Sequence, residues 1–131
     1  MNESFNPTGW DRPSGYSNVI SAKGRIVSVA GQIGWNAKQQ FETDNFAEQV
    51  RQALLNIKAC LEAADALPEH VVRLTWYITD REEYLSLLGE TGEAYREVFG
   101  RVFPVMSMVE VSALMERRAK VEIEATAIVP D

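Results

Sequence analysis

Histidine and cysteine are scarce in this sequence, with one of each among 131 residues. A zinc site needs several such ligands at close spacing, so we expect no zinc, although a magnesium site built only from carboxylates stays open. A Ser-His-Asp triad would need His70 itself, and there is no GxSxG motif to supply its serine. Cys60 cannot form an internal disulfide. Its helical context indicates a small buried hydrophobe, and a reactive exposed thiol is the alternative.

Concentrated positive charge is also missing. The net charge is −6, and the 13 Lys and Arg residues are scattered, whereas a nucleic-acid partner requires a basic footprint. No apolar run approaches membrane-spanning length, and the segment MNESFNPTGW lacks the basic and apolar regions of an export signal. The remaining composition, 46% hydrophobic and 24% charged, is ordinary for a globular protein. We therefore expect one cytoplasmic domain spanning residues 1–131, with no nucleic-acid or membrane partner.

The first half of the chain predicts two strands and a helix. The residues up to Gly15 are expected to be irregular, and the β-prone runs on either side of Lys23-Gly24 predict a hairpin. Asp44 is the expected N-cap of a helix. The apolar residues at helical spacing, which define its buried face, are Phe46, Val50, Leu54, Ile57 and Leu61.

In the second half, the segment HVVRLTWYITD alternates as a strand that His70 opens. Thr79 and Glu82 suggest a capping box for a second helix, which Gly100 ends. Within that helix Gly89 and Gly92 predict a kink or a break, because each glycine costs about 1 kcal/mol relative to alanine. Two more strands are expected over residues 105–114 and 119–129.

The resulting order, ββαβαββ, predicts an α+β two-layer domain in which two helices lie on one face of a mixed sheet. The opposite sheet face still carries apolar residues and needs a cover. Because only two helices are available, we expect copies of the chain to pack sheet against sheet.

Several segments together resemble the Rid (YjgF) family of reactive intermediate deaminases: SGYSNVISAKGRIVSVAGQIG, HVVRLTWYITD, AYREVFG, FPVMSMVEVSAL and AKVEIEATAIV. The resemblance spans nearly the whole chain. It implies a chorismate-mutase-like fold and a homotrimer with a ligand cleft at each subunit interface. It also implies that active members hydrolyse enamines and imines to a keto acid and ammonia, without a metal or a cofactor.

The resemblance places an arginine that grips the substrate carboxylate two residues after the proline that opens the penultimate strand. In this chain Met106 stands there, on the same side of the alternation as Met108 and Glu110. An apolar thioether cannot replace the charged fork of donors. The alternative interpretation is that both methionines simply fill core or interface space.

The other implied cleft residues are matched unevenly. Glu122, whose counterpart positions or activates water, and Tyr16, whose counterpart lines the cleft, are present and are the catalytic candidates. Ala30 stands where a hydroxyl residue is expected, and Gly31 keeps its backbone N–H. Trp35 is a further candidate for the ligand-binding wall. Glu122 as a solvated strand carboxylate, and Tyr16 and Trp35 as packing aromatics, are the structural alternatives.

Two functions remain open from the sequence. The first is a small-molecule-binding protein with an apolar cleft for neutral or aromatic ligands. Whether this protein also hydrolyses neutral or aromatic imines and enamines stays open. The second is an active enamine or imine deaminase that uses Glu122 and Tyr16 and releases ammonia and a keto acid. Whether another arginine replaces the missing charge in the cleft stays open, and the candidates are Arg73, Arg101, Arg117 and Arg118. Ribonuclease activity is a third reading that the acidic charge opposes.

Overall fold

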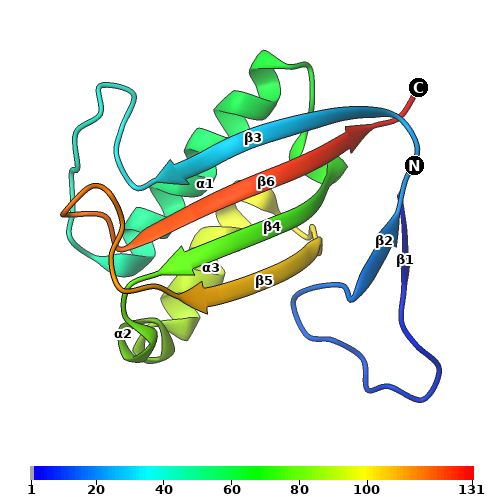
Figure 1. Cartoon of the computed structure of the whole chain (residues 1–131), viewed down its shortest axis with the longest axis horizontal. Coiled ribbons are helices and arrows are strands. Elements are labelled where there is room, and N and C mark those ends of the chain that lie inside the picture. Colours follow the sequence, from blue (N-terminus) through cyan, green and yellow to red (C-terminus); the bar gives the residue numbers. More distant parts are fainter. Residues whose placement is uncertain (1) are drawn as a thin grey trace.

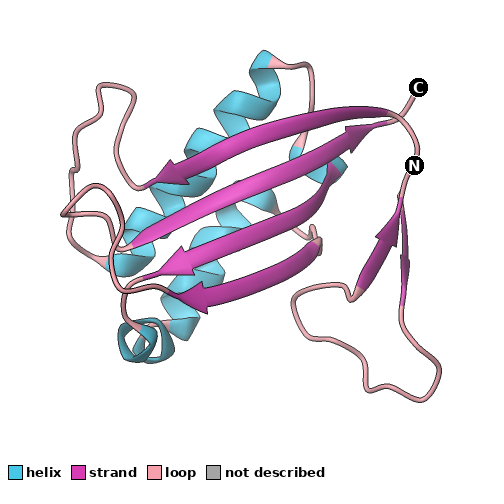
Figure 2. Cartoon of the chain, viewed as in Figure 1, coloured by secondary structure: helices cyan, strands magenta, loops and turns pink. Residues whose placement is uncertain are grey.

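The computed structural model describes residues 2–131, which form a small and a large β-sheet with helices packed against the large one (Figures 1 and 2). In chain order the elements are β1 (Glu3–Phe5), β2 (Val19–Ser21), β3 (Arg25–Ile33), α1 (Phe46–Ala63), a 3₁₀ turn η1 (Pro68–His70), β4 (Val71–Ile78), α2 (Arg81–Ser86), α3 (Leu88–Phe99), β5 (Val105–Glu110) and β6 (Val121–Val129).

The large sheet has the strand order β3-β6-β4-β5. The β3–β6 and β4–β6 pairs are antiparallel, and β4 and β5 are parallel. Parallel neighbours need a crossover connection, which α2 and α3 supply. The helices lie on one face of this sheet (Figure 1). The α+β prediction with helices on one face of a mixed sheet is therefore confirmed.

The predicted apolar face of α1 forms the centre of the core. All five of its predicted residues are at most 1% exposed, and they pack with the buried residues of the sheet. On the other sheet face the described chain places no helix, and Ile26 and Val109 remain 68% and 47% exposed there. The expected need for a cover over this second face is thus visible in the fold.

The predicted hairpin around Lys23-Gly24 is wrong. Strand β2 pairs with β1 in the small sheet, whereas β3 pairs with β6. The expectation of an irregular start is therefore also wrong over Glu3–Phe5, which forms β1. Gly24 has φ +147°, and a Cβ there would lie 2.0 Å from the carbonyl oxygen of Val129. Glycine is required at this point because the backbone passes close to the end of β6.

Both predicted helix caps are one residue too early. Asn45, not Asp44, caps α1 by accepting a hydrogen bond from the third helical residue at 2.9 Å. The Asp44 carboxylate instead pairs with Arg118 at 3.0 Å. Asp80, not Thr79, caps α2. In each case the neighbouring residue has the extended backbone and the free side-chain oxygen that a cap needs.

A break in the second helix was predicted correctly but placed too late. The chain leaves α2 at Leu87, whose φ of −125° is not helical, while Gly89 and Gly92 lie inside α3. Gly100 ends α3 with φ +72°, as expected. Strand β5 ends earlier than predicted because its neighbour β4 ends at Ile78, the partner of Glu110. His70 lies in η1 directly before β4 rather than in the strand.

Across residues 2–131, no helix combines the length and the apolar character that crossing a bilayer requires.

Candidate functional site

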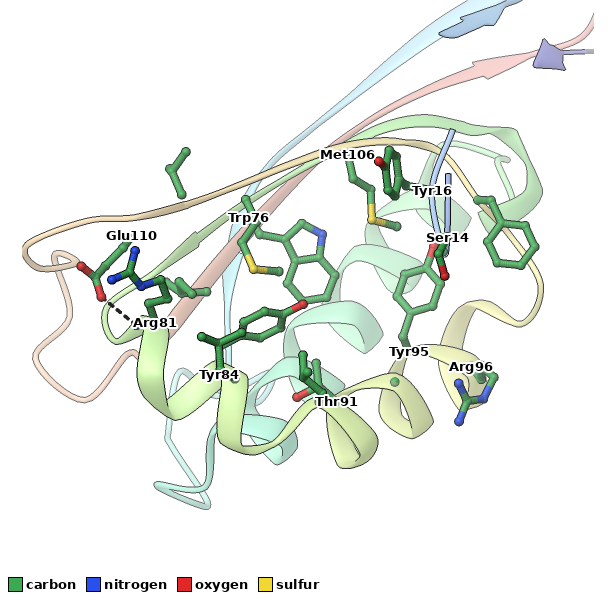
Figure 3. Close-up of a pocket in the computed structure, with 18 of the residues that line it drawn as sticks. Ser14, Tyr16, Trp76, Arg81, Tyr84, Thr91, Tyr95, Arg96, Met106 and Glu110 are labelled. Atoms are coloured by element: carbon green, nitrogen blue, oxygen red, sulfur yellow. Dashed lines mark hydrogen bonds between the residues drawn. The ribbon is translucent and has the colours of Figure 1, made fainter. Parts of the chain in front are cut away.

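A cavity of about 800 Å³ lies between strands β4 and β5 and helices α2 and α3 (Figure 3). Its size is within the range of ordinary ligand pockets. The wall is mostly apolar and aromatic, with charged side chains among its lining residues. The principal lining residues are Tyr16, Trp76, Ile78, Arg81, Tyr84, Leu85, Leu88, Thr91, Tyr95, Arg96, Arg101, Phe103, Met106, Met108 and Glu110.

The two methionines of β5 both line this cavity. In the parallel register Met106 pairs with Leu74 and Met108 with Trp76, so both methionines lie on the helix-covered side of the sheet. Each is half-buried and packs against the core. The prediction that they share one face with Glu110 is confirmed. The Glu110 carboxylate accepts a 2.7 Å hydrogen bond from the backbone N–H of Arg81, which ties the end of β5 to the start of α2 (Figure 3).

Tyr16 is held at the same cavity by the loop that follows β1. The backbone N–H of Ser17 donates to the carbonyl of Pro104 at 3.0 Å, and its hydroxyl donates to the carbonyl of Phe103 at 2.6 Å. These two bonds fix the loop against the start of β5. The structure thereby brings Tyr16, which is 40% exposed, and Met106 into one lining (Figure 3).

Glu122 lies on the opposite face of the sheet. Its neighbours Val121 and Ile123 are fully buried in the core, so alternation directs Glu122 away from the helices. Strand β3 bulges between Val29 and Gln32, and this bulge contains Ala30 and Gly31. A Cβ on Gly31 would lie 2.0 Å from Oε2 of Glu122, so a side chain at position 31 would require the Glu122 carboxylate to move.

Tyr77 and Glu124 share this second face of the sheet. The Tyr77 hydroxyl donates to Glu124 at 2.7 Å, and this hydrogen bond is the main cause that raises the pKa of Tyr77. Glu122 is the register partner of Tyr77 and adds a smaller coulombic contribution in the same direction. The uncovered face therefore carries a line of acidic and hydroxyl groups.

Trp35 lies neither in the cavity wall nor among the residues of the uncovered sheet face. Its ring packs against Phe41 with centroids 5.9 Å apart, and its carbonyl accepts a 2.7 Å hydrogen bond from Asn56. The six site residues expected from the sequence thus divide into three places. Tyr16 and Met106 lie in the cavity, the Ala30–Gly31–Glu122 group lies on the other sheet face, and Trp35 lies in the loop after β3.

The aromatic wall of the cavity was not recognised from the sequence. Trp76, Tyr84 and Tyr95 lie at regular strand and helix spacing, which indicates packing and gives no separate signal for a cavity. Tyr95 lies 6.4 Å from Trp76 between ring centroids, and its hydroxyl donates to the carbonyl of Val102 at 2.6 Å. Burial raises the pKa of the Tyr95 phenol well above its ordinary value.

One of the four arginines considered as replacements lines the cavity, namely Arg101. Arg81 and Arg96, which the sequence did not suggest, line it as well (Figure 3). All three side chains are exposed, so the positive charge is in contact with solvent rather than buried beside Met106. Among residues 2–131, no three His, Cys, Asp or Glu side chains are grouped closely enough to hold a metal ion.

Comparison with known proteins gives consistent matches across the chain. The family model described as endoribonuclease L-PSP matches residues 10–129. A RutC family protein of Pyrococcus horikoshii is 37% identical over 113 residues, covering 86% of this chain and 85% of the relative. The 2-iminobutanoate/2-iminopropanoate deaminase of Escherichia coli K12 is 34% identical over 105 residues, covering 80% of each chain.

Solved structures also match this chain over most of its length. A conserved Rid family protein of unknown function from Yersinia pestis has a TM-score of 0.86 at 30% identity, with 98% of each chain covered. The structure of Escherichia coli TdcF with bound serine has a TM-score of 0.69 at 26% identity, covering 88% of this chain and 94% of that chain.

Proposed function

The chain belongs to the endoribonuclease L-PSP family, also called the Rid or YjgF family, and from that premise we propose that it binds neutral or aromatic small molecules, including imines and enamines. The observation that carries this proposal is Met106. Where the family resemblance assigns a carboxylate-gripping arginine, this chain has a half-buried thioether in an apolar cavity wall. A carboxylate placed there gains no charge-assisted hydrogen bond from that position.

The cleft in this proposal is completed by a second copy of the chain. Met106 and Glu122 lie on opposite faces of the same sheet, so one chain alone does not present both to one ligand. The uncovered face, which carries Glu122, also has exposed apolar residues that need a cover. A second copy packed against this face covers its apolar residues. Because β5 is an edge strand of the sheet, the edge that carries Met106 in one copy can meet the face that carries Glu122 in the next, and the family resemblance suggests a homotrimer.

The assembly can be tested directly. Size exclusion with light scattering is expected to give a mass three times that of the 14.7 kDa chain. The physical reason is that burial of the uncovered apolar face requires a partner surface. A monomer at micromolar concentration would contradict both the trimer and the shared cleft.

A second candidate function, imine hydrolysis, is favoured by the position of Glu122 beside the Gly31 backbone. In this reaction water adds to the C=N carbon, and the nitrogen leaves as ammonia, which gives the carbonyl product. Glu122 is the candidate base that takes a proton from the attacking water, and Tyr16 lines the ligand cleft. An RNA substrate is not proposed, although the family description names an endoribonuclease, because a net charge of −6 repels a polyanion.

One experiment separates these two candidates. Benzophenone imine is a neutral aromatic imine, and we expect it to quench the intrinsic tryptophan fluorescence of the protein by binding beside Trp76, whereas pyruvate, a small keto acid, produces no saturable change. Ammonia release is measured in parallel. Binding with ammonia release above the uncatalysed rate supports the hydrolase, and binding without acceleration supports a binding protein. Saturable binding of pyruvate, or no binding of the imine, would overturn the proposal.

A further inference from the structure

Two residues that line the cavity each carry a buried polar atom without a hydrogen-bond partner. Within residues 2–131, Nε1 of Trp76 and Oγ1 of Thr91 are the buried side-chain nitrogen and oxygen atoms left unpaired. Trp76 is 4% exposed and Thr91 is 5% exposed, and both residues line the same cavity. A buried polar group without a partner is unfavourable, so folded proteins retain few of them, and each requires an explanation.

The two atoms come from opposite walls. Trp76 belongs to β4 in the sheet, and Thr91 belongs to α3, which packs over it (Figure 3). The indole N–H can only donate a hydrogen bond, whereas the threonine hydroxyl can donate or accept. Most of the other lining residues are methionine, aliphatic or aromatic, with charged side chains among them. Such a cavity, apolar with a few polar groups, is the usual form of a small-molecule site.

We propose that this cavity takes a neutral, mostly apolar molecule that carries a hydrogen-bond acceptor such as a carbonyl oxygen. The acceptor receives the Trp76 N–H, and the Thr91 hydroxyl hydrogen-bonds to the same ligand from the helix side. This inference rests on the proposed function and specifies its ligand class. A carboxylate is disfavoured at this depth because the arginines of the cavity, Arg81, Arg96 and Arg101, have exposed side chains.

Access to the two atoms requires a small rearrangement, since both are shielded from solvent. In this proposal Met106 and Met108 provide it at Trp76. Met108 is the direct register neighbour of Trp76, and both methionines are only half-buried. An unbranched thioether changes rotamer at low cost, so these side chains can move aside when a ligand enters.

Three probes with the same ring system test the proposal by equilibrium dialysis against the intact protein. They are 2-acetylnaphthalene, the isosteric alkene 2-isopropenylnaphthalene, and 2-naphthoate. The ketone is expected to bind about tenfold more tightly than the alkene, because only the ketone can accept from Trp76. The naphthoate is expected to bind more weakly than the ketone.

Two variants test which side chain causes the preference for the ketone over the alkene. Trp76→Phe keeps an aromatic ring but removes the N–H, and it is expected to reduce the ketone-to-alkene affinity ratio to about one. Thr91→Val keeps the shape of the side chain but removes the hydroxyl. Because the single carbonyl oxygen of the ketone is assigned to Trp76, this variant is expected to keep the ketone-to-alkene affinity ratio of the parent. Because Thr91→Val also removes an unpaired buried group, its thermal midpoint should not fall. Trp10→Phe is the control, since Trp10 is 63% exposed and does not line the cavity.

The outcomes distinguish this inference from the proposed function. Equal binding of ketone and alkene, or an unchanged ratio in Trp76→Phe, would overturn the inference and leave the proposed function standing. Tighter binding of naphthoate than of the ketone would overturn the inference in favour of recognition by the arginines. Failure of all three probes to bind would overturn both.

Discussion

Replacing Met106 by arginine is expected to raise kcat/KM for 2-aminoacrylate by about a hundredfold, from a parent rate close to the uncatalysed one. A buried charge pair that loses one partner loses roughly 2–5 kcal/mol of interaction free energy. If the arginine fork contributes about 3 kcal/mol in the transition state, its restoration corresponds to this change in rate.

The cavity has the room that this substitution needs. Met106 is half-buried and borders about 800 Å³ of open space, so a longer side chain can extend into it. The guanidinium would then lie among the aromatic rings of the wall, which can offset part of its desolvation through cation–π contacts. In the assay a serine dehydratase generates 2-aminoacrylate, and pyruvate formation is followed at catalytic concentrations of each variant.

Met115→Arg is a matched control for charge. Met115 is 93% exposed in the connection between β5 and β6, so the same chemical change there leaves the cavity untouched. An equal gain in that variant would show a non-specific effect of positive charge. If the parent instead released pyruvate efficiently at catalytic concentration, another group must grip the carboxylate. Arg96 and Arg101, which line the cavity, would then be the first residues to change.

Local periodicity predicted the parts of the fold that depend on a single element. The apolar face of α1 follows from steps of three and four residues, and the shared side of Met106 and Met108 follows from strand alternation. Pairing between distant segments has no such signal. The β2 segment looked like the first arm of a hairpin, yet its partner is β1, across a long loop. Gly24, which lies between two β-prone runs, suggested a hairpin turn. Its role in the structure is instead to let the backbone pass close to the end of β6.

For the candidate site, the sequence suggested individual residues but not their arrangement. Alternation gives two sides for each strand, but it does not say which side of β5 corresponds to which side of β6. That relation is fixed by the register of both strands with β4, which lies between them. The structure shows that Met106 shares a face with Leu74, and that Glu122 shares the opposite face with Tyr77. The separation of the two candidate residues emerges only at this level.

This separation leads to the second large expected effect, which is activity from two inactive proteins. The first protein is the parent, which has Glu122 but no arginine at position 106. The second is the double variant Met106→Arg/Glu122→Gln, which has the arginine but lacks the candidate base. Loss of a general base typically lowers the rate by about a hundredfold or more, so each protein alone is expected to be near background.

Unfolding and refolding an equal mixture of these two proteins is expected to restore pyruvate release from 2-aminoacrylate. A shared cleft takes position 106 from one copy and position 122 from the next, so random assembly gives both functional residues in about a quarter of the clefts. The mixture should therefore reach roughly a quarter of the Met106→Arg rate at the same total concentration. The comparison holds once native mass spectrometry shows mixed oligomers, and each protein refolded alone is the control. The test requires that Met106→Arg is active and that the double variant is not. If mixed oligomers then form without activity, the arginine and Glu122 belong to one chain's site, and the shared cleft is refuted.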